Sequence, residues 1–178
     1  MRANVLSVGA RRWRLVVWGA AALLFLLPGV AMQFTDEVQW NRYDFAVFAA
    51  MLGGACAAYE LLARGHPNHL YRAGIGVALL GGFMLVWING AVGIIGREDN
   101  PANLLFGLIL LIGAVGAALA RVRARGMACT LLAMAVAQTA VYVAALAAGW
   151  PHSNLAAAFF VALWLAAALL FWRAAQPG

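Results

Sequence analysis

The chain has 178 residues, of which 66% are hydrophobic and only 10% are charged, and its mean hydropathy is +0.88. Because soluble domains carry about 25% charged residues, this composition excludes an ordinary soluble protein and predicts an integral membrane protein. The 12 basic residues are all arginines that flank apolar runs, so the net charge of +6 reflects orientation in a membrane and not binding to nucleic acid.

The first apolar run covers residues 15–34 and follows an arginine-rich segment, residues 1–14. Its length matches the ~20 residues that cross a bilayer, so we expect the first span here. Pro28 is expected to kink that helix, because proline removes one backbone donor. A cleaved signal peptide is the alternative, since Gly29-Val30-Ala31 is similar to a cleavage site, although the run exceeds the about 7–15 residues of a signal core.

Residues 35–44 combine acidic and aromatic side chains, a mixture typical of a loop at the membrane interface. The second span is predicted over residues 45–62. Glu60 lies near its end, four residues before Arg64, and we expect these two side chains to pair along one helix face.

Four further apolar runs predict spans at residues 73–96, 104–120, 127–149 and 155–171. The predicted fold is therefore all-α, a polytopic transmembrane helix bundle in which six helices form three successive hairpins within one domain, residues 1–178. Only Arg42 and Arg97 fall on the side opposite to the other ten arginines. By the positive-inside rule, both termini are expected in the cytoplasm, with the chain in a bacterial inner membrane.

The connection before the fourth span concentrates charge. Arg97, Glu98 and Asp99 are consecutive and predict an interfacial turn, because hydrocarbon excludes charged groups. Asn100 and Pro101 predict a helix start: the asparagine side chain can cap free amides, and proline at the first helical position lacks a donor that would go unpaired. A well-capped surface turn is the simpler interpretation of these residues, and a binding loop is the alternative.

Polar side chains inside the spans are few. Asn89 lies in the third span, on a face shared with Gly82, Gly93 and Gly96 by helical arithmetic, and should therefore meet a close helix neighbour. Gln138 and Tyr142 lie one turn apart in the fifth span. Hydrogen bonding between helices is the expected role of all three, and lining a solute path is the alternative.

Catalytic and metal-binding patterns do not appear in the sequence. The three histidines all lie in predicted loops, and there is no HExxH, GxSxG or phosphate-binding glycine loop. Cys56 and Cys129 lie in apolar runs without the spacing of a zinc or redox site, so both are expected to stay reduced. We predict no metal, no cofactor and no catalytic residue.

The stretch WINGAVGIIGREDNPAN, residues 87–103, resembles small bacterial inner-membrane proteins that carry no assigned function. This resemblance implies the membrane class and no functional residue. The sequence favours a non-enzymatic accessory or interaction component whose partners are the lipid bilayer and a second copy or another membrane protein. The alternative is a small oligomeric transporter or channel lined by Asn89, Gln138 and Tyr142.

Overall fold

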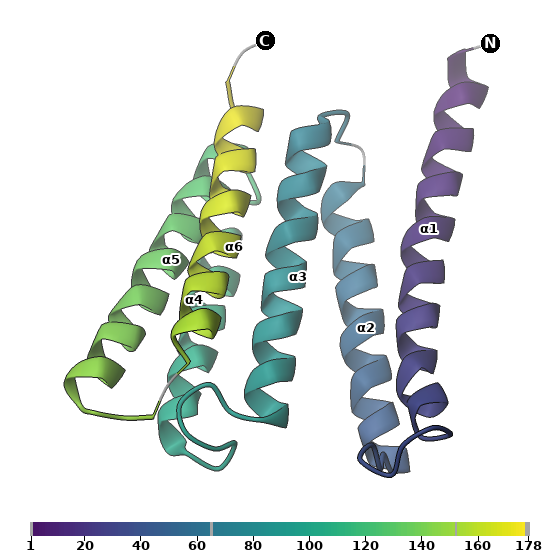
Figure 1. Ribbon diagram of the computed structural model, residues 1–178. Coiled ribbons are helices and arrows are strands. Elements are labelled where there is room, and N and C mark those ends of the chain that lie inside the picture. Colours follow the sequence, from purple (N-terminus) through teal and green to yellow (C-terminus); the bar gives the residue numbers. More distant parts are fainter. Residues whose placement is uncertain (1, 65, 152, 177–178) are drawn as a thin grey trace. The chain divides into compact units, whose positions relative to one another are not determined.

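The computed structural model describes residues 2–64, 66–151 and 153–176, and these residues form helices joined by short connections (Figure 1). The helices are α1 (Arg2–Ala31), α2 (Arg42–Ala63), α3 (His69–Ala91), α4 (Leu104–Leu119), α5 (Ala124–Ala147) and α6 (Asn154–Ala174), with a 3-10 turn η1 (Pro101–Asn103) before α4. All six helices are long and apolar enough to cross a membrane. The prediction of an all-α chain with six helices is thereby confirmed.

Most helix boundaries differ from the prediction by one to four residues, and the two largest differences are at the start of α1 and the end of α3. Helix α1 begins at Arg2, so the arginine-rich segment is helical and continuous with the first apolar run. Helix α3 ends at Ala91 and not at Gly96, because Gly93 and Gly96 have positive φ angles of 72° and 71° that leave the right-handed helix. Both glycines therefore belong to the connection after α3, and the predicted helical face that joined them to Asn89 does not extend that far.

The chain divides into two compact units, residues 1–61 and residues 62–178. In the first unit, the ring of Phe25 on α1 lies 5.8 Å from that of Phe45 and 6.4 Å from that of Phe48. Glu60 forms an ion pair with Arg14 of α1 and not with Arg64, which corrects the predicted pairing. The reason is that α2 ends at Ala63, so the helical geometry of an i,i+4 pair is not available to Arg64.

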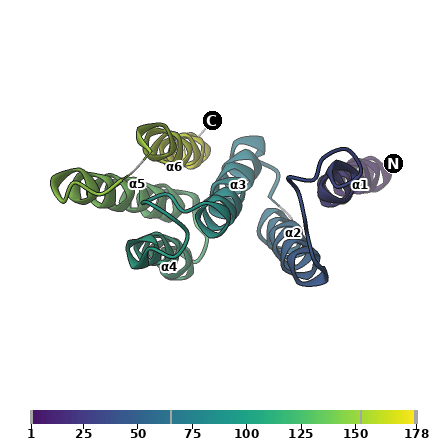
Figure 2. The same ribbon diagram turned by 60° about the horizontal axis from the view of Figure 1, so that its bottom comes forward.

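In the second unit, the four helices follow one another around the bundle in the order α3, α6, α5, α4 (Figure 2). Helix α3 packs mainly on α6, and α4 packs mainly on α5, while α3 and α4 contact each other less. Helices that follow one another in the chain are therefore not always packed most closely. The main neighbour of α3 in this unit is α6, the last helix of the described chain.

Small residues on α3 explain why it packs on α6. A Cβ atom added at Gly81 would lie 2.8 Å from the ring of Trp164, and one at Gly74 would lie 3.0 Å from the ring of Phe171. Both aromatic side chains are fully buried. The two glycines are seven residues apart, as are the two aromatic residues, so the contact repeats every two turns along both helices. Glycine provides the space that each large ring fills.

Helices α4 and α5 also pack through glycines, here against side chains smaller than the aromatic rings of α6. A Cβ at Gly113 would lie 2.8 Å from the sulfur of Met134, and one at Gly116 would lie 2.5 Å from Cγ2 of Thr130. The Thr130 hydroxyl donates to the carbonyl of Gly126 within α5, so this polar group is satisfied at the contact. Close backbone approach thus joins α4 to α5 without an unpaired hydroxyl at their contact.

Candidate functional site

The connection between α3 and α4 folds around the side chain of Asn103, which is only 5% exposed. Its Oδ1 accepts hydrogen bonds from the backbone amides of Ile94 at 3.2 Å and Ile95 at 2.9 Å. Its Nδ2 donates to the carbonyl of Ile95 at 3.3 Å and to that of Arg97 at 2.7 Å. One amide side chain therefore satisfies four backbone groups of a buried, non-helical segment, which would otherwise carry unpaired donors and acceptors.

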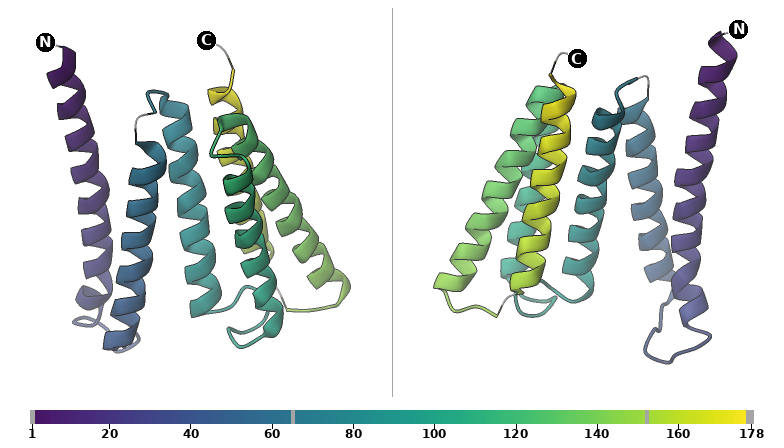
Figure 3. Two further views of the ribbon diagram at one scale, coloured as in Figure 1. Left: turned by 180° about the vertical axis from the view of Figure 1, so that it is seen from behind. Right: turned by 45° about the horizontal axis from the view of Figure 1, so that its top comes forward.

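Glycine makes this compact connection possible. A Cβ at Gly93 would lie 2.5 Å from the backbone carbon of Arg97, and its φ of +72° is one that other residues rarely adopt. The amide of Gly96 donates to the carbonyl of Pro151 at 2.8 Å, which ties the α3–α4 connection to the α5–α6 connection. Figure 3 shows these two connections at the same end of the second unit.

The predicted charged turn lies at the surface of this connection. Arg97, Glu98 and Asp99 are exposed. Asn100 accepts a hydrogen bond from the amide of Ala102 at 2.9 Å, so it caps η1 as its sequence position indicated, and α4 begins at Leu104. The capping residue is thus three residues before Asn103. Asn100 caps η1, whereas Asn103 bonds the backbone of Ile94, Ile95 and Arg97.

Asn89 lies in the last turn of α3, beside the same connection. Its Nδ2 donates to the backbone carbonyl of Asn103 at 3.1 Å. Its Oδ1 is buried and has no hydrogen-bond partner among the described residues. The neighbour that Asn89 meets is therefore the start of α4, through one amide nitrogen.

Gln138 and Tyr142, one turn apart on α5, both line one small cavity. Gln138 is 1% exposed and its Oε1 accepts from the indole Nε1 of Trp164 at 3.5 Å. The hydroxyl of Tyr142 donates to Oδ1 of Asn154 at 2.7 Å. The cavity beside these side chains measures about 10 Å³, which holds at most one water molecule.

Ile94 and Ile95 also line this cavity. The sequence analysis placed Ile94 and Ile95 in the third span and Gln138 and Tyr142 in the fifth, and the structure brings these four residues together. Glu60 is the one candidate residue that belongs to the first unit, where its partner is Arg14.

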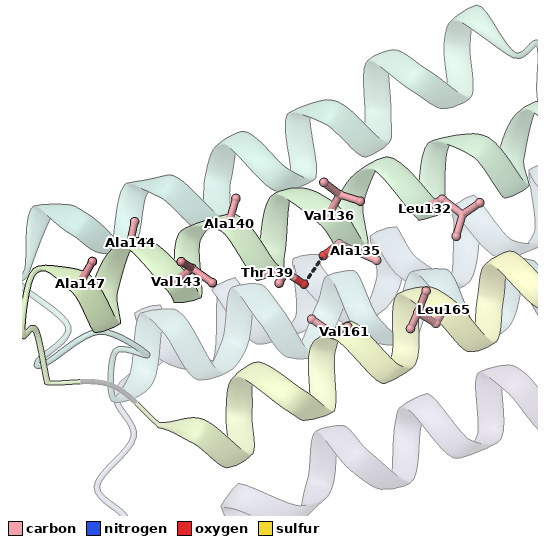
Figure 4. A pocket seen from close by; sticks show the side chains of 10 residues that line it. All are labelled: Leu132, Ala135, Val136, Thr139, Ala140, Val143, Ala144, Ala147, Val161 and Leu165. Atoms are coloured by element: carbon pink, nitrogen blue, oxygen red, sulfur yellow. Dashed lines mark hydrogen bonds between the residues drawn. The ribbon is translucent and has the colours of Figure 1, made fainter.

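A larger groove runs along α5 and α6 and is open to the surroundings (Figure 4). Its volume is about 640 Å³, and nine of its ten lining residues are apolar. Thr139 is the exception, and its hydroxyl donates to the carbonyl of Ala135 at 2.8 Å, the bond drawn in Figure 4. A groove with this lining suits aliphatic groups and offers no charge to a polar solute.

The described residues contain no cluster of three or more histidine, cysteine or acidic side chains that could hold a metal ion. Cys56 and Cys129 are both free thiols, the first buried and the second exposed on α5. His152 lies outside the described residues.

Sequence reasoning did not single out Asn103, Asn154 or Trp164. The signal for the two asparagines was present, because each immediately precedes a leucine that opens an apolar run, where a polar side chain is positioned to bond a neighbouring chain segment. Trp164 offered no such signal within a uniformly apolar span. No family model, curated protein or solved structure matches the chain.

Proposed function

We propose that this protein is a non-enzymatic accessory or interaction component of a bacterial inner membrane, which binds a second copy of itself or another membrane protein. This proposal is supported mainly by the hydrogen bonds that the polar side chains of the predicted spans form. Asn89, Gln138 and Tyr142 each bond another part of the second unit, and the cavity beside the last two has space for no more than one water. A path for a solute needs a wider, polar-lined space.

The apolar surface supports the same proposal. The groove along α5 and α6 is open and bordered by exposed Val136 and Leu165, which are 70% and 46% exposed. Membrane helices associate through close van der Waals packing against such surfaces. The groove is therefore the surface that we expect a partner to contact.

Affinity purification from the native membrane in a mild detergent tests this function. A protein partner, or a second copy carrying a different tag, should copurify with the unmodified chain. Val136→Trp should reduce that yield several-fold because the indole would fill the groove. Leu111→Trp changes a residue of α4 that is also exposed, at 56%, and should leave the yield unchanged. Recovery of lipid alone with the unmodified chain would contradict the proposal.

We also propose that both termini face the cytoplasm. Ten arginines against two support this orientation. Within the second unit, the α3–α4 connection and the end of α6 lie at opposite ends (Figure 3). A reporter enzyme fused after residue 178 should be active in the cytoplasm, whereas the same reporter inserted beside Asp99 should be active outside. An external signal from the C-terminal fusion would reverse the assignment.

A further inference from the structure

The second unit carries its charge unevenly. Six of its arginines belong to segments at one end: Arg64, Arg72, Arg121, Arg123, Arg125 and Arg173. Its only acidic residues are Glu98 and Asp99. These follow α3, a helix of 23 residues that starts at the arginine-rich end, so about 35 Å separates the two charge groups along the helix axis. The aspartate and glutamate of this unit therefore lie at the end opposite to the six arginines.

Specific contacts hold the arginine-bearing segments together. The hydroxyl of Tyr71, at the start of α3, donates to the carbonyl of Val122 in the α4–α5 turn at 2.6 Å. The ring of Tyr71 lies 5.2 Å from that of Phe171 near the end of α6. Asn68 adds a bond from its Nδ2 to the carbonyl of Ala174 at 3.4 Å. Since Tyr71 is 3% exposed, this junction is a fixed part of the core.

The α4–α5 turn presents its arginines outward. Arg121 and Val122 have φ angles of 47° and 54°, and the bond from Tyr71 holds this left-handed turn in place. Arg121, Arg123 and Arg125 are exposed, three positive charges within five residues. Exposed apolar side chains lie beside the arginine segments, including Leu119 at 80% and Trp172 at 51% exposure. The end thus combines guanidinium groups with an apolar border.

We propose that this arginine-rich end binds the headgroups of anionic phospholipids, with their acyl chains against the neighbouring apolar residues. Guanidinium groups form paired hydrogen bonds with phosphate oxygens, and clustered basic residues next to membrane spans attract anionic lipids. The apolar border distinguishes a lipid from a soluble phosphate, because only the lipid also supplies hydrocarbon. This site is independent of the protein partner proposed above, and it concerns the opposite end of the unit from the Asn103 connection.

The test compares lipids bound by the purified full chain in a neutral detergent. The chain is mixed with equal amounts of phosphatidylglycerol and phosphatidylcholine, and the bound lipids are counted by native mass spectrometry. The unmodified chain should retain phosphatidylglycerol preferentially. The triple variant Arg121→Gln, Arg123→Gln, Arg125→Gln should lower the affinity for phosphatidylglycerol by about fivefold for each charge removed and leave phosphatidylcholine binding unchanged.

One control variant and one alternative variant accompany this test. Arg97→Gln removes an exposed arginine from the opposite end of the same unit and should keep the full preference for phosphatidylglycerol. The single variant Arg123→Gln gives a smaller loss in the same direction and serves if the triple variant does not fold. An unchanged preference in the folded triple variant would overturn the proposal. Loss of the preference in the unmodified chain on adding millimolar inorganic phosphate would also overturn it, since soluble phosphate would then be the ligand.

Discussion

Replacing Asn103 with leucine is expected to lower the free energy of unfolding by about 3–4 kcal/mol, because buried backbone groups left without a partner cost about 1–3 kcal/mol each. Leucine has a similar volume but no polar atom, so the amides of Ile94 and Ile95 lose their acceptor while remaining buried. The measurement is unfolding of the full chain in mixed micelles with an increasing fraction of a denaturing detergent.

Two other asparagines of the same region provide controls for this variant. Asn100→Ala removes a cap with one side-chain bond and should cost about 1 kcal/mol. Asn89→Ala removes one bond to the Asn103 carbonyl and an oxygen without a partner, so its cost should also be small. If Asn103→Leu proves no more destabilising than these two, the connection does not depend on the Asn103 side chain.

Gly81→Ala is expected to destabilise the second unit by about 1–3 kcal/mol, the usual cost of overpacking a filled core. The new methyl group would meet the six-membered ring of Trp164 at 2.8 Å, and this ring is fully buried. Moving the indole would also disturb its bond to Gln138. A lower thermal midpoint in detergent, measured by loss of helical circular dichroism, is the expected result.

Gly90→Ala is the matched control on the same helix. No atom lies within 4 Å of the added Cβ there, and alanine is about 1 kcal/mol more favourable than glycine inside a helix. This variant should therefore keep or raise the midpoint. Equal destabilisation by Gly81→Ala and Gly90→Ala would indicate that glycine serves backbone flexibility in α3 and not its contact with α6.

The helices were predictable because each apolar run has the length that a membrane span requires, and because Asn100 and Pro101 start a helix through local bonds alone. The end of α3 could not be predicted in this way. The run from Ala73 to Gly96 is apolar apart from Asn89, and only the positive φ angles of Gly93 and Gly96 show that the chain leaves the helix before its apolar sequence ends.

The candidate site was likewise predictable only in part. The spacing of Gln138 and Tyr142 correctly placed both on one side of α5, since that follows from helical geometry. Their partners, Trp164 and Asn154, come from α6, and nothing in the local pattern of either helix identifies its neighbour. Hydrophobicity does not select partners inside a membrane, because lipid is as apolar as another helix, so the fit of Gly81 to Trp164 decides the pairing.

The pairing of α3 with α6 has a consequence for biogenesis. The ribosome delivers α3 to the membrane before α4, α5 and α6, yet the rings that fill the spaces at Gly74 and Gly81 are on α6. Until that helix is inserted, the glycine face of α3 borders lipid or the insertion machinery. A nascent chain arrested after α5 should therefore expose this face to a membrane-embedded protease or crosslinker, and release of α6 from the ribosome should protect it.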